Sequence, residues 1–127
     1  MTKVSELTGA ELDYWVAKAL GKNPCIESGN CMVSWNAGEF GGNETHRAYF
    51  QPSVNWGLGG QIIVRDRISV YASMDEGTLL HWTAVVETMQ TSRRGWIGPT
   101  PLVAAMRAYV SSKYGDTVPA DTQEANQ

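Results

Sequence analysis

The residues best suited to hold a small anion precede the last strongly patterned segment of the chain. Gly98-Pro99-Thr100-Pro101 leads into a predicted helix, whose first amides are unpaired and carry a partial positive charge. Arg93 and Arg94 lie just upstream, with Trp96 beside them, and Arg107 follows within the helix. This order predicts a site for phosphate or carboxylate with Thr100 at its centre. An exposed Arg-Arg turn before an ordinary helix cap is the alternative.

Tryptophan is the second candidate feature, with five in the chain. Trp15 and Trp82 fall on patterned apolar faces and are predicted to be core residues. The others lie in irregular segments beside Gly or Asn, where an indole can stack on a flat ligand. These candidate stacking residues are Trp35, Trp56 and Trp96. Simple packing of a loop tryptophan remains the alternative reading.

The run Gly57-Leu58-Gly59-Gly60 resembles a phosphate loop only superficially. It lacks the Lys-Ser/Thr of a Walker loop and the G-x-G-x-x-G pattern. We interpret it as a tight backbone feature, in which Gly59 and Gly60 are candidate ligand contacts.

The histidines and cysteines of the sequence do not indicate a catalytic site or a metal site. Neither His46 nor His81 has a recognisable nucleophile elbow nearby, so no catalytic residue is predicted and the protein is expected not to be an enzyme. Cys25 and Cys31 are six apart and indicate free thiols of a reducing compartment. Their spacing, and that of the two histidines, does not fit a zinc site. We expect no metal and no cofactor.

Composition excludes several classes of protein. The chain has 127 residues, 43% hydrophobic and 18% charged, which fits one folded domain rather than a disordered chain. No apolar run approaches the ~20 residues of a membrane span, and the first residues do not resemble a signal peptide, so a cytoplasmic protein is expected. Ten basic residues stand against 13 acidic ones. Without a basic excess, binding to duplex nucleic acid is disfavoured.

Two helices are predicted from their ends. Thr8 and Glu11 have the spacing of a capping box, the apolar periodicity runs over about residues 9–20, and Gly21 suits a left-handed C-cap. The second helix begins at Pro101, with Thr100 as N-cap, and closes at Gly115.

Between these helices the pattern is weaker. Alternation predicts strands over 68–72 and 80–86, joined by a turn at 75–77. Residues 22–48 carry one possible strand, 31–35, and Ser53 is predicted to cap a short helical turn. The expected fold is α+β: an N-terminal helix, a small antiparallel sheet with a glycine-rich irregular centre, and a C-terminal helix packed on the sheet. Residues 1–116 form the domain, and 117–127 an acidic, disordered tail.

Three stretches carry a family resemblance: SELTGAELDYWVAKA at 5–19, NWGLGGQII at 55–63 and GPTPLVAAMR at 98–107. In the same order, they resemble the NinX-like proteins of tailed phages and prophages, over most of residues 4–116. Family members usually have Asp at Asn55 and often Pro at Gln61. The resemblance implies a phage accessory protein acting in the bacterial host cytoplasm, and it carries no catalytic residues over.

Two functional hypotheses follow. In the first, the protein binds and sequesters a small nucleotide-like host ligand, such as a defence signal: tryptophans stack on its base, and Arg93, Arg94 and the helix start at Thr100 hold phosphate. In the second, an aromatic and glycine-rich surface binds and inhibits or redirects a host defence or metabolic protein. In either case we expect a homo-oligomer, with a dimer favoured, because exposed tryptophan tends to be covered.

Overall fold

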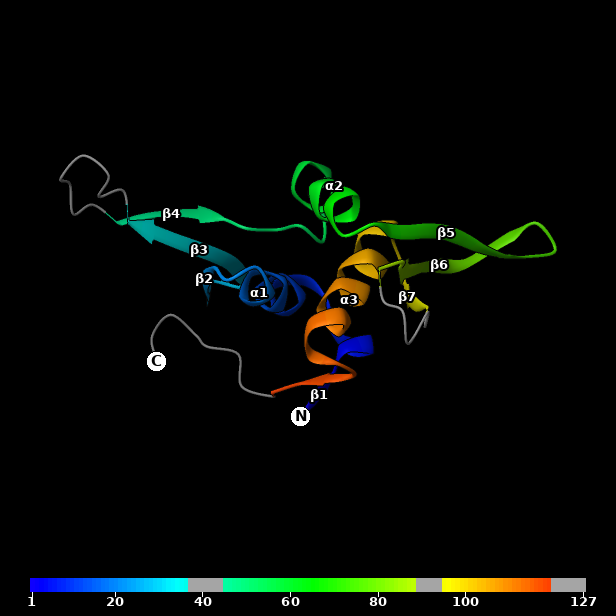
Figure 1. The fold of residues 1–127 in the computed structure, drawn as a ribbon, viewed down its shortest axis with the longest axis horizontal. Coiled ribbons are helices and arrows are strands. Elements are labelled where there is room, and N and C mark those ends of the chain that lie inside the picture. The colour runs from blue at the N-terminus through cyan, green and yellow to red at the C-terminus, as the bar shows by residue number, and fades with distance from the viewer. Residues whose placement is uncertain (37–44, 89–94, 120–127) are drawn as a thin grey trace.

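A central helix, α3 (Pro101–Tyr114), organises the molecule (Figure 1). The computed structural model describes residues 1–36, 45–88 and 95–119. Thr100 is the N-cap, its side chain accepting a hydrogen bond from the Val103 amide, and Gly115 ends the helix with a φ of +86°. Both predicted ends are therefore confirmed. Every residue from Leu102 to Val110 is buried, however, so α3 is covered on all sides instead of on one face.

The N-terminal helix, α1 (Gly9–Ala19), packs against α3 and the first sheet. Thr8 is its N-cap but makes no side-chain capping hydrogen bond, so the predicted capping box is wrong. The predicted C-cap is confirmed. Gly21 has a φ of +79°, and the amides of Gly21 and Lys22 donate to the carbonyls of Lys18 and Ala17 at 3.0 and 2.9 Å, as in a Schellman motif.

The first sheet joins three antiparallel strands, β2 (Asn23–Glu27), β3 (Asn30–Asn36) and β4 (Thr45–Tyr49). The sequence predicted only a short strand within β3. Ser28 and Gly29 both have positive φ, 51° and 78°, which forms the primed turn that matches the twist of a two-residue hairpin. Figure 1 shows this sheet with α1 on one side of α3.

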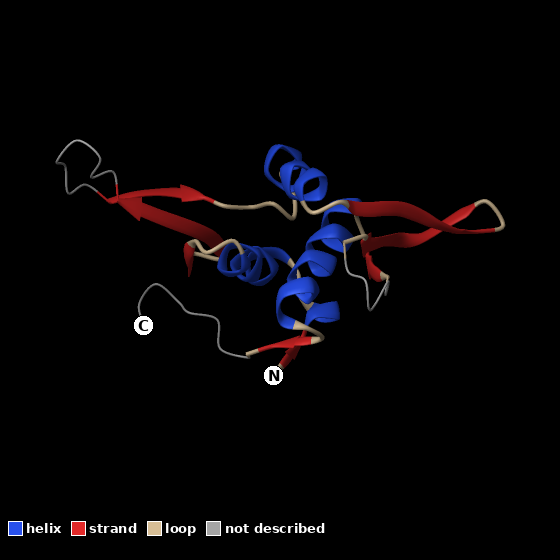
Figure 2. Cartoon of the chain, in the orientation of Figure 1, coloured by secondary structure: helices blue, strands red, loops and turns tan. Residues whose placement is uncertain are grey.

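The second sheet joins β5 (Ile68–Asp75), β6 (Thr78–Val86) and β7 (Trp96–Gly98). Positive φ angles at Glu76 and Gly77 confirm the predicted turn. The register shifts between Ser73 and Met74, and the outer part of the β5–β6 hairpin extends away from the helices (Figure 2). The inner part packs on α3. This hairpin is longer than predicted, because exposed residues continue the strands past the core.

Helix α2 (Trp56–Arg65) corrects the prediction of a short turn capped by Ser53. Its N-cap is Asn55, whose Oδ1 accepts from the Leu58 amide at 3.2 Å. The glycine run thus lies inside a helix rather than an irregular centre. Glycine weakens a helix interior, and the packing of Ile62 in the core offsets this cost.

The first and last described strands, β1 (Thr2–Lys3) and β8 (Thr117–Val118), form a two-stranded ribbon next to the short 3-10 helix η1 (Val4–Glu6). Val118 is fully buried. Thr117 and Val118 therefore belong to the domain, not to a tail, while residues 120–127 lie outside the described residues. The α+β class with helices near both ends is confirmed.

Candidate functional site

Trp56 and Thr100 are the two predicted site residues that the structure brings together. They line a small hollow of about 200 Å³ between the starts of α2 and α3, which we call the helix-start hollow. Its other lining residues are Ser53, Val54, Pro101 and Leu102. Trp56 is 59% exposed. Thr100 Oγ1 already accepts from the Val103 amide at 3.1 Å, and the walls are largely apolar, so this hollow suits an apolar group better than a phosphate.

Trp96 and Arg107 do not reach the surface. Trp96 is only 6% exposed and belongs to the core, which leaves little indole for stacking on a ligand. Arg107 is also buried; its Nε donates to the Leu7 carbonyl at 2.9 Å and its Nη1 to the Ile97 carbonyl at 2.8 Å. Burial lowers the pKa of Arg107. Arg107 is therefore engaged within the fold, where it joins the segment before α1 to β7.

Gly59 and Gly60, the two glycines predicted as ligand contacts, differ in how closely other atoms pack against them. A Cβ on Gly59 would lie 2.6 Å from Leu102 Cδ2 and 2.6 Å from the Pro52 carbonyl oxygen. Close packing of α2 therefore explains Gly59 without a ligand. A Cβ on Gly60 would meet nothing within 4 Å, so packing does not explain this glycine, and its role as a ligand contact stays a prediction.

Three further predicted site residues are not seen near Thr100. Arg93 and Arg94 lie outside the described residues. Trp35 lies in β3, where its backbone is paired with that of His46, and β3 is on the opposite side of α3 from the β5–β6 hairpin (Figure 1). Among the predicted residues that the structure describes, only Trp56 lines the same hollow as Thr100.

A larger pocket of about 560 Å³ lies where the end of α1, the β3–β4 hairpin and α2 meet. We call it the α1–α2 pocket. Its apolar and aromatic lining residues are Leu20, Val33, Ala48, Tyr49, Phe50, Leu58 and Ile62, and its polar ones are Lys22, Gln61 and Arg65. A mostly apolar hollow of this size with a few polar groups is typical of small-molecule sites.

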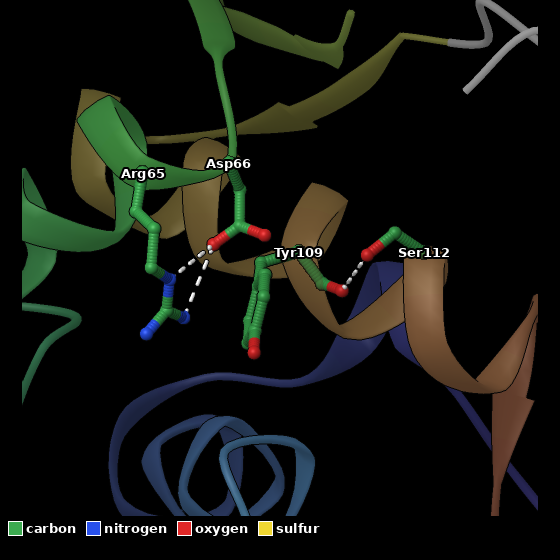
Figure 3. Close-up of polar contacts among 4 residues, drawn as sticks. All are labelled: Arg65, Asp66, Tyr109 and Ser112. Atoms are coloured by element: carbon green, nitrogen blue, oxygen red, sulfur yellow. Dashed lines mark hydrogen bonds and ion pairs between the residues drawn. The ribbon is translucent and has the colours of Figure 1, made fainter. Parts of the chain in front are cut away.

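Two cations stand at this pocket. The Lys22 ammonium lies 5.7 Å from the centre of the Phe50 ring, a cation–π distance. Arg65, at the last turn of α2, donates to the Asp66 carboxylate at 3.1 Å. Figure 3 shows Arg65 and Asp66 beside the ring of Tyr109 of α3. Burial raises the pKa of Tyr109, whereas Arg65 opposes that shift.

Backbone contacts hold the pocket walls in place. The Phe50 amide donates to the Cys31 carbonyl at 3.0 Å, which fixes Phe50 against β3. The Ser53 amide donates to Asp13 Oδ1 at 2.9 Å, which anchors the segment between β4 and α2 to α1. Asp13 is 3% exposed, and burial raises its pKa to about 6 although the hydrogen bonds with Ser53 lower it.

The cysteines lie on adjacent strands, Cys25 in β2 and Cys31 in β3. Burial, with smaller contributions from Asp13 and Cys25, raises the pKa of the Cys31 thiol to about 12, so this sulfur is a poor nucleophile at neutral pH. Within residues 1–36, 45–88 and 95–119, no group of three or more His, Cys, Asp and Glu side chains is placed to hold a metal ion. No helix of that part of the chain is long and apolar enough to cross a membrane.

The residues of the α1–α2 pocket were missed by sequence reasoning. Lys22 and Arg65 follow or end helices, and Tyr49 lies in β4, a strand that the sequence did not predict. The Ser28-Gly29 pair, a known turn signal between strands, could have revealed the first hairpin. No local pattern places the end of α1 beside α2, since that contact depends on how both pack on α3.

Comparison with known proteins agrees with the sequence motifs. The model of the family described as Bacteriophage P22, NinX matches residues 3–113. A search of curated proteins finds no match. The match spans both outer helices and the two sheets between them, so the chain belongs to the Bacteriophage P22 NinX family.

Proposed function

We propose that this phage protein binds and sequesters a small nucleotide-like molecule of the host, and that the α1–α2 pocket holds it. The observation that carries this proposal is the combination, in one pocket of about 560 Å³, of aromatic walls with the cations of Lys22 and Arg65. The sequence-based hypothesis placed the same ligand class at Arg93, Arg94 and the helix start at Thr100. The proposal moves it to a pocket that α2 lines with later residues, from Leu58 to Arg65.

The chemistry of the lining supports a flat ligand with negative charge. Tyr49 is an exposed aromatic residue of the wall, and aromatic faces stack on bases of any sequence. Lys22 and Arg65 supply charge-assisted donors, which phosphate accepts strongly. The Gln61 side chain adds an amide that can donate to or accept from a base edge.

Sequestration fits this pocket better than turnover. Among the described residues that line it, none is a Cys, His, Asp, Glu or Ser that could act as nucleophile or general base. The buried carboxyl of Asp13 is not among the lining residues and is engaged with the Ser53 amide. A phage protein that holds a host signalling nucleotide without converting it would remove that signal from the cell.

The first experiment is native mass spectrometry of protein purified from phage-infected cells, followed by denaturation and analysis of the released small molecules. We expect a nucleotide-like mass that is bound before denaturation and free afterwards. Protein that carries no small mass, and that also fails to bind a panel of mono-, di- and cyclic nucleotides by calorimetry, would reject the proposal.

A matched pair of lysine variants locates the ligand. Lys22→Ala should weaken binding, because it removes a cation from the pocket. Lys18→Ala is the control: Lys18 also lies near an aromatic ring, 5.9 Å from the centre of Tyr14, yet it does not line the pocket. Equal loss in both variants would show a general charge effect and no site at the α1–α2 pocket.

The helix-start hollow favours a second candidate function, binding of a host protein. Val54 and Trp56 are exposed beside this hollow of about 200 Å³, and aromatic residues at apolar pockets are frequent interface anchors. Under this alternative, a host protein crosslinks to the wild-type chain in infected cells, Trp56→Ala abolishes the crosslink, and Lys22→Ala leaves it intact.

A further inference from the structure

Strand β5 has an edge with which no described strand of the chain pairs. In the second sheet the order is β5-β6-β7, so β5 pairs with β6 on one side only. It runs for eight residues, Ile68–Asp75, and its outer part extends beyond the helices (Figure 1). The unpaired amides and carbonyls of such an edge readily pair with another strand.

The edge strand also exposes apolar surface. Tyr71 is 53% exposed and Met74 54% exposed. Tyr71 lies in the regular part of the strand, and Met74 follows the register shift after Ser73. Ile68, at the start of the strand, is buried against the core. A strand added at this edge would therefore cover exposed apolar side chains of β5.

The two ends of β5 carry opposite charges. Arg67 immediately precedes the strand, and Asp75 is its last residue. Both are exposed, and within the described part of the chain neither makes an ion pair. A strand that is basic at its start and acidic at its end is complementary to a second copy of itself running in the opposite direction.

We propose that two copies of this chain form a two-fold symmetric dimer by antiparallel pairing of their β5 edges, centred on Tyr71. This register puts Arg67 of each copy beside Asp75 of the partner subunit. It also puts Met74 of each copy opposite Ile68 of the partner subunit, and the two Tyr71 rings side by side. Symmetry repeats every contact, as in an isologous interface, and the two sheets become one continuous sheet.

This dimer is independent of the ligand proposal, because neither Arg67 nor any residue of β5 lines the α1–α2 pocket. It also gives a different reason for the oligomer expected from the sequence. Of the tryptophans Trp15, Trp56, Trp82 and Trp96, only Trp56 is well exposed, and it lies at the start of α2, outside the proposed interface.

Charge reversal tests the register. Arg67→Asp leaves only acidic groups at the two contact positions, and Asp75→Arg leaves only basic ones, so each variant should repel itself. We expect sedimentation velocity at low salt to show a concentration-dependent dimer for the wild type and at least about tenfold weaker association for each variant. An equimolar mixture of the two variants should associate again, since each then meets the opposite charge.

Lys18→Asp, which alters charge on α1, is the control and should dimerise as the wild type does. Circular dichroism and thermal melting show whether each variant folds, and recovery in the mixture cannot arise from a misfolded chain. A wild-type protein that stays monomeric at the highest soluble concentration would overturn the proposal. It would do so even if the β5 edge were then found to bind a different protein. A dimer that both reversals leave unchanged, or a mixture that does not recover, would overturn it as well.

Discussion

The Ser53 amide donates a 2.9 Å hydrogen bond to the buried carboxylate of Asp13, joining residues 40 positions apart. Asp13 lies on α1, and Ser53 lies in the segment that leads from β4 into α2. This contact fixes the relative position of two walls of the α1–α2 pocket. It does so at a cost, because a carboxylate with few charged partners is removed from water.

Asp13 predicts an unusual pH dependence of stability. Its pKa is raised from 3.8 to about 6 in the folded protein, so between these values the folded state holds a proton that the unfolded chain releases. The stabilising contribution of the protonated group is complete below about pH 4 and is lost as the pH rises through about 6. Asp13→Asn keeps an acceptor without the charge. At pH 7.5 this variant should be more stable than the wild type by about 1–3 kcal/mol.

Urea denaturation at a series of pH values measures this difference. The gap between Asp13→Asn and the wild type should narrow as the pH falls through about 6 and should close only near pH 4. Asp13→Ala serves as the comparison: it removes the acceptor of the Ser53 amide and should cost about 1–3 kcal/mol relative to Asp13→Asn. If the stability curves of wild type and Asp13→Asn run parallel from pH 5 to 7.5, Asp13 does not titrate in this range.

Arg107 should be among the most sensitive positions of the fold. Its replacement by Ala leaves the buried carbonyl of Leu7 without its donor and removes the bond to Ile97. We expect a loss of about 3–5 kcal/mol in the free energy of unfolding. Arg107→Lys should restore little of this stability, because one ammonium cannot reproduce the forked geometry of the guanidinium.

Arg65→Ala, at an exposed arginine, is the control and should change stability by less than about 1 kcal/mol. Similar losses at both positions would contradict the structural role of Arg107.

Gly59 and Gly60 form a matched pair within α2. Gly59→Ala places a Cβ within 2.6 Å of Leu102 Cδ2 and the Pro52 carbonyl, and it should destabilise the fold by about 1–3 kcal/mol. Gly60→Ala meets no atom within 4 Å and should stabilise by about 0.5–1 kcal/mol, because alanine is the better helix former. Thermal melting of both variants measures whether their stabilities change in these opposite directions. A stabilising Gly59→Ala would mean that α2 does not pack as closely as described.

Lys22 and Arg65 should act together if they hold one anionic group. Each single replacement by Ala is expected to weaken ligand binding by about 1–2 kcal/mol, since both side chains are exposed to solvent. The double variant should lose less than the sum, as expected of residues that share a partner. Isothermal titration calorimetry of the four proteins with the identified ligand gives this coupling. Strict additivity would place the two cations on separate groups.

Local rules explain which parts of the fold could be predicted. Thr100, Pro101 and Gly115 marked the ends of α3, Gly21 marked the end of α1, and the Asp75-Glu76-Gly77 turn marked the second hairpin, since each acts through its own backbone. Helix α2 was not predicted, because its glycines disfavour a helix. The need for glycine at position 59 becomes clear only from its close contact with Pro52 and Leu102 in the tertiary structure. The ribbon of β1 and β8 joins the two ends of the described chain, which no local pattern can reveal.

The sequence by itself determined the family, the α+β class, the main helix ends and the turn of the long hairpin. It did not determine the site. Trp96 and Arg107 have residue types suited to a ligand, yet packing around α3 buries both, whereas Lys22 and Arg65 meet at one pocket although 43 positions separate them. Side-chain chemistry is local, but exposure and convergence depend on which surfaces the core covers, and that is decided only when α1, α2 and both sheets pack against α3.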